Sequence, residues 1–228
     1  MGKQKKVPTV SVENLKEIAA QLSCPSGSEG KEIGELLHFS NEGMIKESVL
    51  SLKLKNNKRV LELGHGNCSH LPDLLKEGAQ LRYFGMEISE VMQKEAQRIN
   101  ASYVEKGQAL FSLYDGQKIP YVLNFFDNVF SVNTIYFWNN PVALLKEIYR
   151  VLKPNGKFVL TFVNSSCMEK LPFVAQTNFF ELYDSPKIID LVDKTDFVLM
   201  TITSKKEKVK SKTGDWVDRD YSIVVLTK

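Results

Sequence analysis

Four residues in the first half of the chain have types and a spacing suited to binding a cofactor: Glu62, Gly64, Gly66 and Glu87. Glycine tolerates positive φ and has no Cβ, so a turn at Gly64 and Gly66 can bring bare backbone N–H groups against a ligand. The carboxylate of Glu62 suits a ligand with positive charge better than it suits a pyrophosphate. Glu87 follows Gly64 by 23 residues, a spacing at which an acid often accepts hydrogen bonds from ribose hydroxyls. Alternatively, Glu87 caps a helix that starts at Ser89.

The elements around these residues must present them at one edge of a sheet. Val60, Leu61 and Leu63 predict a buried strand that ends at the glycines, and a helix is expected to begin between residues 67 and 69. Residues 82–87 predict a second strand, which a helix again follows. Strand, glycine turn and helix in this order predict an α/β fold, whose strand ends open into a ligand crevice.

The middle of the chain continues this alternation. Residues 110–114 predict a third strand and residues 125–133 a fourth. Asn140-Pro141 starts an amphipathic helix, residues 154–156 (Pro-Asn-Gly) end it, and residues 157–163 predict a fifth strand.

Two long strands are predicted at the end of the chain, residues 197–210 and 216–227, joined at Thr213-Gly214-Asp215. Strands connected so tightly must be antiparallel. The sheet is therefore expected to be mostly parallel, with an antiparallel hairpin as its last part.

These features together resemble the class I S-adenosylmethionine-dependent methyltransferases over residues 40–228. The resemblance is carried by Glu62-x-Gly64-x-Gly66 with Glu87, by the block from Phe126 to Phe158, and by the terminal hairpin. It implies a Rossmann-like three-layer α/β sandwich, with a mostly parallel seven-stranded sheet that ends in an antiparallel C-terminal hairpin.

The resemblance also implies which residues bind the cofactor, S-adenosylmethionine. Glu87 holds the ribose, Ile88 and Asp115 flank the adenine, and Asp115 alternatively only stabilises its own turn. Cys68 stands where the family has a further glycine, and His65 is expected to contribute its backbone. The implied cofactor-binding residues are Glu62, Gly64, His65, Gly66, Cys68, Glu87, Ile88, Asp115, Gly116 and Asn133.

The implied reaction is transfer of the sulfonium methyl group, by in-line displacement, to an unidentified and small-molecule acceptor. Tyr136 and Trp138, beyond the fourth strand, and the helices before residue 54 are expected to contact that acceptor; no catalytic residue is assigned. Two alternatives stay open: an NAD(P)-dependent oxidoreductase, and a non-catalytic binding protein with the S-adenosylmethionine fold.

The N-terminal segment, residues 1–54, precedes the methyltransferase domain, which is assigned to residues 55–228. Residues 11–22 predict a helix, residues 24–30 a turn, and residues 32–39 and 41–54 two further helices. These helices either form a lid over the site or pack permanently against the sheet edge.

Three other signals favour structural roles. Tyr149-x-x-x-Lys153 matches a dehydrogenase pair but falls on the inward face and end of one helix, which favours core packing. The lysine run from Lys205 to Lys212 indicates a solvated strand edge more than nucleic-acid binding. His38 and His70 have no acid or cysteine at metal spacing, so no metal site is expected.

Composition limits the remaining possibilities. A chain of 228 residues with 43% hydrophobic and 25% charged residues fits one large α/β domain. The net charge of +3 does not favour a nucleic-acid partner. Three cysteines without a C-x-x-C pair indicate a reducing compartment, and the most apolar span, residues 121–138, is interrupted by Asn124, Asp127, Asn128 and Asn133. We therefore expect a cytoplasmic protein without membrane contact; the oligomeric state stays open.

Overall fold

The computed structural model describes residues 11–210 and 216–228. Its centre is a seven-stranded sheet with the strand order β3-β2-β1-β4-β5-β7-β6. The strands are β1 (Arg59–Leu63), β2 (Arg82–Glu87), β3 (Ala109–Leu113), β4 (Phe126–Val132), β5 (Leu152–Val163), β6 (Val198–Lys210) and β7 (Trp216–Thr227).

The predicted topology is confirmed. Strands β1 to β5 pair in parallel, and β7 pairs antiparallel with both β5 and β6. The predicted turn at Thr213-Gly214-Asp215 lies outside the described residues. Strand β1 lies between β2 and β4. The strand order therefore changes direction at β1, which makes it the topological switch point of the sheet. A ligand crevice is expected outside the carboxyl ends of the strands at this point.

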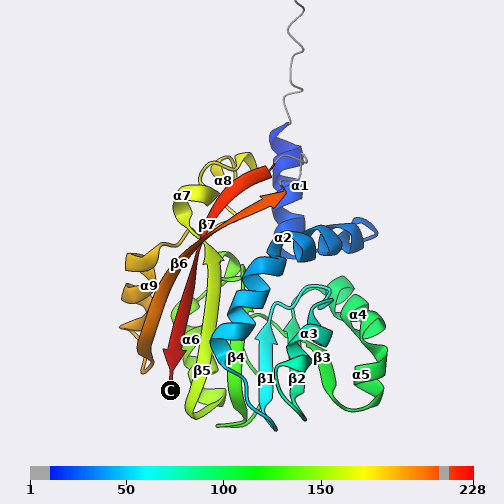
Figure 1. The fold of residues 1–228 in the computed structure, drawn as a ribbon. Helices are drawn as coiled ribbons and strands as arrows, with labels where there is room; N and C mark the ends of the chain where they lie inside the picture. The colour runs from blue at the N-terminus through cyan, green and yellow to red at the C-terminus, as the bar shows by residue number, and fades with distance from the viewer. Residues whose placement is uncertain (1–10, 211–215) are drawn as a thin grey trace, which may run out of the picture.

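Helices cover both faces of the sheet. Figure 1 shows α2 in front of β4 and β5, α6 behind them, and α4 and α5 beside β3. The helices are α1 (Val12–Ser23), α2 (Glu29–Leu52), α3 (Leu71–Lys76), α4 (Glu90–Ile99), α5 (Ala101–Glu105), α6 (Pro141–Val151), α7 (Ser165–Met168), α8 (Pro172–Ala175) and α9 (Ser185–Val192), with a 3-10 turn η1 (Ile135–Phe137). In this part of the chain, none of the helices has the length and apolar character needed to cross a membrane.

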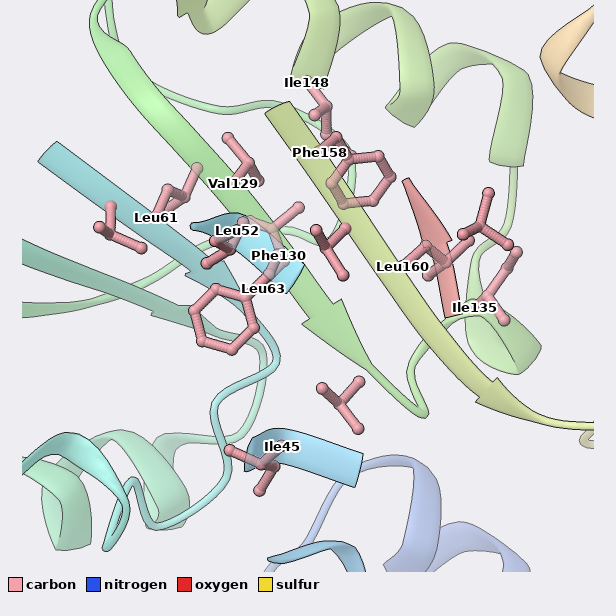
Figure 2. Packing of buried hydrophobic residues seen from close by; sticks show 14 of the residues in the cluster. Ile45, Leu52, Leu61, Leu63, Val129, Phe130, Ile135, Ile148, Phe158 and Leu160 are labelled. Atoms are coloured by element: carbon pink, nitrogen blue, oxygen red, sulfur yellow. The ribbon is translucent and has the colours of Figure 1, made fainter. Parts of the chain in front are cut away.

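The core lies between the sheet and its helices. Figure 2 shows Leu61, Val129 and Leu160 of three neighbouring strands, and it also labels Leu52 of α2 and Ile148 of α6, which belong to the same buried cluster. These side chains are all buried. Burial of such side chains contributes about 1.5–3 kcal/mol each, so the parallel strands, covered on both faces, are firm supports for the loops at their ends.

The N-terminal prediction was wrong in one respect: residues 29–52 form the single helix α2, not two helices. Figure 1 shows this helix bent near its middle. The second part is fixed to the sheet, because Ser48 Oγ lies 2.6 Å from Thr161 Oγ1 and Glu47 binds Lys205 at 2.5 Å. A Cβ at Gly43 would lie 2.5 Å from Glu207 Oε2, so glycine lets α2 approach the hairpin there.

Helix starts follow the predicted capping in two cases and not in a third. Ser89 accepts a hydrogen bond from Met92 N and Asn140 one from Ala143 N, as N-cap residues do. The helix after the glycine turn begins only at Leu71, although we expected it between residues 67 and 69. Residues 67–70 instead form a turn, which places His70 beside β1.

Candidate functional site

A pocket opens at the carboxyl ends of β1, β2 and β4, where the sequence places the two acids. It has a volume of about 150 Å³. The lining residues are Leu22, Ser23, Pro25, Gly34, Leu37, His38, Asn41, Ile45, Glu62, Gly64, His65, Gly66, Asn67, Glu87, Ile88, Met92, Tyr114, Gly116, Val132, Asn133, Thr134, Phe137 and Trp138. Two of these described residues are acids, and none is Lys or Arg.

The glycine turn has the geometry that only small residues allow. Gly64 has φ +73°, and a Cβ there would lie 2.4 Å from Thr134 Cγ2. Gly66 has φ +57°, and its missing Cβ would meet nothing within 4 Å, so this backbone borders open space. Cys68 adopts φ +52°, which explains why a glycine would suit its position.

Glu62 is buried, with 2% of its surface exposed, and its carboxylate is held by side chains. Its Oε2 accepts hydrogen bonds from His70 Nε2 at 2.8 Å and from the Tyr83 hydroxyl at 2.5 Å. Burial raises the pKa of Glu62, but the charge of His70 and both hydrogen bonds lower it by more, so Glu62 is ionised. A buried anion is thus kept at the pocket wall by two neighbouring donors.

Our expectation that His70 lacks acidic or cysteine partners was wrong. The ligand atoms of Glu62, Cys68 and His70 all lie within 4.8 Å of one another, because the turn at 67–70 folds back on β1. In a tetrahedral zinc site the nitrogen and carboxylate ligands would lie about 3.3 Å apart. The 2.8 Å between His70 Nε2 and Glu62 Oε2 is the distance of a hydrogen bond, so these two side chains are hydrogen-bonded to each other.

Glu87 is held by the backbone. Its Oε1 accepts from Ile88 N at 2.8 Å and Ser89 N at 3.1 Å, and its Oε2 accepts from Gly66 N at 3.0 Å. Glu87 therefore supports the start of α4 and also lines the pocket, and its contact with a ribose stays a prediction. A carboxylate has about four acceptor positions, so one remains on Oε2 for a ligand.

The pocket is covered from the N-terminal side. The Ser89 hydroxyl donates to Pro25 O in the α1–α2 connection, which places this connection over the Glu87 end. A Cβ at Gly34 would lie 2.6 Å from Met92 Sδ, so α2 approaches α4 closely. His38 of α2 covers the Glu62 end, where its ring stacks on His70 with the centroids 6.2 Å apart.

The side of the pocket beyond β4 is apolar with a few neutral polar groups. Asn133 Nδ2 donates to Asn41 Oδ1 at 2.9 Å, which ties β4 to α2. The Trp138 indole N–H donates to Thr134 Oγ1 at 3.0 Å. Tyr136 is buried behind Asn133, and its hydroxyl accepts from Val163 N at 2.6 Å.

Three predicted site residues do not line the pocket: Cys68, Asp115 and Tyr136. Asp115 is exposed and accepts from Gln117 N and Lys118 N, both at 2.8 Å, so it stabilises its own turn as in the alternative interpretation. Cys68 and Tyr136 are buried, and they hydrogen-bond to Tyr83 and Asn133, respectively. The other predicted residues meet at one pocket: Glu62, Gly64, His65, Gly66, Glu87, Ile88, Gly116, Asn133 and Trp138.

Sequence reasoning did not name several lining residues individually. Tyr114, Thr134 and Phe137 are chain neighbours of residues that it did name. His38 and Asn41 come from α2, which we expected to contribute only as a helix before residue 54. Residues next to a motif can be predicted by extending that motif along the chain. Helix α2 contains no motif that would indicate which of its residues face the pocket.

The structural interpretation of the dehydrogenase-like pair is consistent with its surroundings. The Tyr149 ring packs edge-on against Phe197 with centroids 5.1 Å apart, and Lys153 binds Asp127 at 2.8 Å. Neither residue lines the pocket.

Three lysines of β6, Lys205, Lys206 and Lys208, have acidic neighbours. Lys206 stands opposite Asp220 and Lys208 opposite Asp218 in the hairpin register. Lys205 binds Glu47.

Comparisons with known proteins point to a methyltransferase. Residues 61–160 match the family model described as a methyltransferase domain. An uncharacterized methyltransferase, YdaC of Bacillus subtilis, is 29% identical over 56% of this chain and 68% of its own length. A tRNA U34 carboxymethyltransferase of Vibrio cholerae is 29% identical over 71% of this chain, which spans only 52% of that protein.

The fold has a solved counterpart. A SAM-dependent methyltransferase from Aquifex aeolicus superposes with a TM-score of 0.61 at 19% identity, over 96% of this chain and 99% of the other. Identity this low establishes the fold, and the matched domain model and the relatives supply the activity. Residues 61–160 match a methyltransferase domain, and the relatives and the fold together support a class I S-adenosylmethionine-dependent methyltransferase.

Proposed function

We propose that this pocket binds S-adenosylmethionine and that the methyl group passes, by in-line displacement, to a small and uncharged acceptor. One observation carries the proposal: Glu62 and Glu87 border the pocket, and no Lys or Arg is among the described residues that line it. A pocket with this charge favours a cationic cofactor. It disfavours the pyrophosphate of NADH or NADPH, which usually meets a helix N-terminus or basic groups.

The residues present fit the cofactor. The backbone at Gly66 borders open space in which no Cβ intrudes, so a ligand can approach it closely. Glu87 Oε2 keeps one acceptor position for a ribose hydroxyl, and Glu62 Oε1 accepts no hydrogen bond from the described residues. Glu62 is thus available to an ammonium group. Ile88, Tyr114 and Gly116 form the wall on which an adenine would lie.

S-adenosylmethionine supplies an electrophilic methyl group on a sulfonium, which needs little further activation. The chain then mainly has to align the acceptor and exclude water. The Thr134–Trp138 hydrogen bond fixes the indole at the pocket edge, and the Asn133–Asn41 bond holds α2 against β4. Pro25 and His38 lie over the two ends of the pocket.

The acceptor side favours a small molecule over a nucleic acid. Leu37, Ile45, Phe137 and Trp138 give it an apolar wall. The Vibrio relative acts on tRNA by its name, but a polyanion requires several Lys or Arg contacts. The described pocket lining offers none, and the lysines at 206 and 208 stand opposite acids.

A ligand panel tests the proposal. Thermal unfolding is measured with S-adenosylmethionine, S-adenosylhomocysteine, NADH and NADPH. We expect stabilisation by the first two only, since a ligand at ~100 Kd adds ~2.7 kcal/mol to folding. Stabilisation by NADH or NADPH alone would contradict the proposal and favour the oxidoreductase.

Turnover distinguishes an enzyme from a non-catalytic binding protein. S-adenosylhomocysteine release is followed while neutral apolar small molecules, anionic small molecules and bulk tRNA are supplied as acceptors. We expect release with neutral acceptors. Release with tRNA alone would overturn the small-molecule part of the proposal.

A further inference from the structure

A cluster of four buried side chains lies directly behind the pocket wall at β1. We call Glu62, Cys68, His70 and Tyr83 the Glu62 cluster. Each residue is at most 8% exposed. The Cys68 thiol donates to the Tyr83 hydroxyl at 3.2 Å, and that hydroxyl donates to Glu62 Oε2 at 2.5 Å. His70 Nε2 reaches the same oxygen at 2.8 Å.

The two donors use only one of the two carboxylate oxygens. Glu62 Oε1 accepts no hydrogen bond from residues 11–210 or 216–228, and Glu62 lines the pocket. His70 and Tyr83 therefore hold the carboxylate from behind and leave Oε1 for a ligand. Such a carboxylate is oriented before any ligand arrives, which reduces the ordering cost of binding.

Only one group of the cluster can balance the charge of Glu62 with a proton. Burial raises the pKa of the Cys68 thiol and of the Tyr83 hydroxyl, so both stay neutral. Burial opposes a charge on His70, but the adjacent Glu62 carboxylate outweighs it and places the pKa of His70 well above its ordinary value. The 2.8 Å contact of His70 Nε2 with Glu62 Oε2 and this direction of the pKa shift together favour His70 as the cation beside Glu62.

The groups that face His70 from other elements do not balance the charge of Glu62. His38 of α2 stacks on it, and burial together with His70 lowers the pKa of His38. His65 is buried and its pKa is lowered. Phe130 of β4 contacts the ring edge-on and carries no charge. Asp73 of α3 is exposed and binds Lys76.

We propose that His70 is a positioning residue that exchanges its proton for the cofactor's ammonium group. In the free protein, protonated His70 neutralises Glu62. When the ammonium of the cofactor reaches Glu62 Oε1, two cations would share one buried carboxylate, and the His70 proton leaves to solvent. This inference rests on the proposed function, since it takes the S-adenosylmethionine class of ligand as the occupant of the pocket.

The physical consequence is a proton released on binding, which depends on the ligand's amino-acid part. Release of one proton makes binding tighter as pH rises, by up to roughly tenfold per pH unit, until His70 is deprotonated in the free protein. A ligand with the same adenosine thioether but no amino-acid part brings no ammonium and should release no proton.

The experiment is calorimetric titration with S-adenosylhomocysteine and with methylthioadenosine, each in two buffers of different ionisation enthalpy. We expect release approaching one proton with S-adenosylhomocysteine and none with methylthioadenosine. In His70→Gln, an amide can still donate to Glu62 but cannot titrate, so the release should disappear. His38→Gln, which alters the neighbouring imidazole, should keep it.

The outcomes separate this inference from the proposed function. If neither ligand binds the wild-type protein, the proposed function fails, and this inference with it. If both bind with equal proton release, or S-adenosylhomocysteine releases none, only the role of His70 is overturned. Should His70→Gln fail to fold, the comparison of the two ligands on the wild-type protein decides alone.

Discussion

Glu62 and Glu87 stand near the ends of neighbouring strands and border one pocket, yet their carboxylates are held in different ways. Side chains of His70 and Tyr83 hold Glu62, whereas backbone N–H groups of Gly66, Ile88 and Ser89 hold Glu87. Side-chain donors can titrate and can be removed by mutation. Backbone donors do neither, so the two ends of the pocket should respond differently to mutation and to pH.

The largest effect is expected from removal of Glu62. Glu62→Ala leaves a buried imidazolium without its counter-ion and should lower the free energy of unfolding by ~3–5 kcal/mol, measured in denaturant melts. Glu90→Ala is the matched control, because Glu90 forms an exposed pair with Lys94 on the surface of α4 and should change stability little. Equal losses in the two variants would show that the Glu62 cluster contributes no special stability.

Removal of Glu87 should affect folding and binding together. Glu87→Ala takes an acceptor from three backbone N–H groups and should cost ~2–4 kcal/mol of unfolding free energy. It also removes the one acceptor left for a ribose hydroxyl, so S-adenosylhomocysteine affinity should fall roughly 10- to 150-fold by calorimetry.

Glu87→Gln should not rescue either property. Both carboxylate oxygens accept from N–H donors, so the amide NH₂ of a glutamine would face a donor whichever way it is turned. A Gln variant with wild-type stability and affinity would mean that the backbone contacts of Glu87 do not hold it.

The two acids should also differ in their pH dependence. The pKa of Glu62 is lowered from 4.5, so its stabilisation is lost as pH falls below that value. The pKa of His70 is raised well above 6.5, so its stabilisation is complete below 6.5 and is lost as pH rises through the raised value.

The stability difference between wild type and Glu62→Ala should therefore be largest between about pH 4.5 and 6.5 and should shrink at alkaline pH. The difference for Glu87→Ala should not shrink there, because backbone N–H groups do not titrate. If both stability differences changed in the same way at alkaline pH, His70 would not be the titrating group that stabilises Glu62.

The smallest effect is expected in the hydrogen exchange of the segments that lie over the pocket, the α1–α2 connection and the first part of α2. The pocket volume of about 150 Å³ is below the 300 Å³ or more of usual ligand pockets, so we propose that the α1–α2 connection moves to admit the cofactor. Hydrogen exchange in residues 23–39 should slow when S-adenosylhomocysteine is added. Exchange in residues 44–52 should stay constant, since Ser48 and Glu47 already fix that part of α2. An equal change of exchange rate in residues 23–39 and 44–52 would show that the movement is not confined to the first segment.

Local patterns were sufficient to predict the order of elements and the glycine turn. The apolar run before Gly64 and the caps at Ser89 and Asn140 depend on residues close together in sequence, and these predictions were confirmed. The antiparallel hairpin followed from the short connection between two long strands.

Contacts between distant residues could not be predicted in this way. The donors to Glu62 lie 8 and 21 residues away, and both depend on how the turn at 67–70 and strand β2 pack on β1. The continuity of α2 depends on its contacts with β5 and the hairpin. The contact of Asp115 with an adenine rests on the family resemblance and stays a prediction.

The hydrogen bond from Ser89 to Pro25 has a kinetic consequence. In the proposed cofactor site the α1–α2 connection lies over the end assigned to the adenosine. We therefore expect the cofactor to enter before the acceptor and the thioether product to leave after the methylated one. Departure of that product, and not methyl transfer, would then set the turnover rate. A serine that caps a helix would in this way also control how long each spent cofactor stays bound.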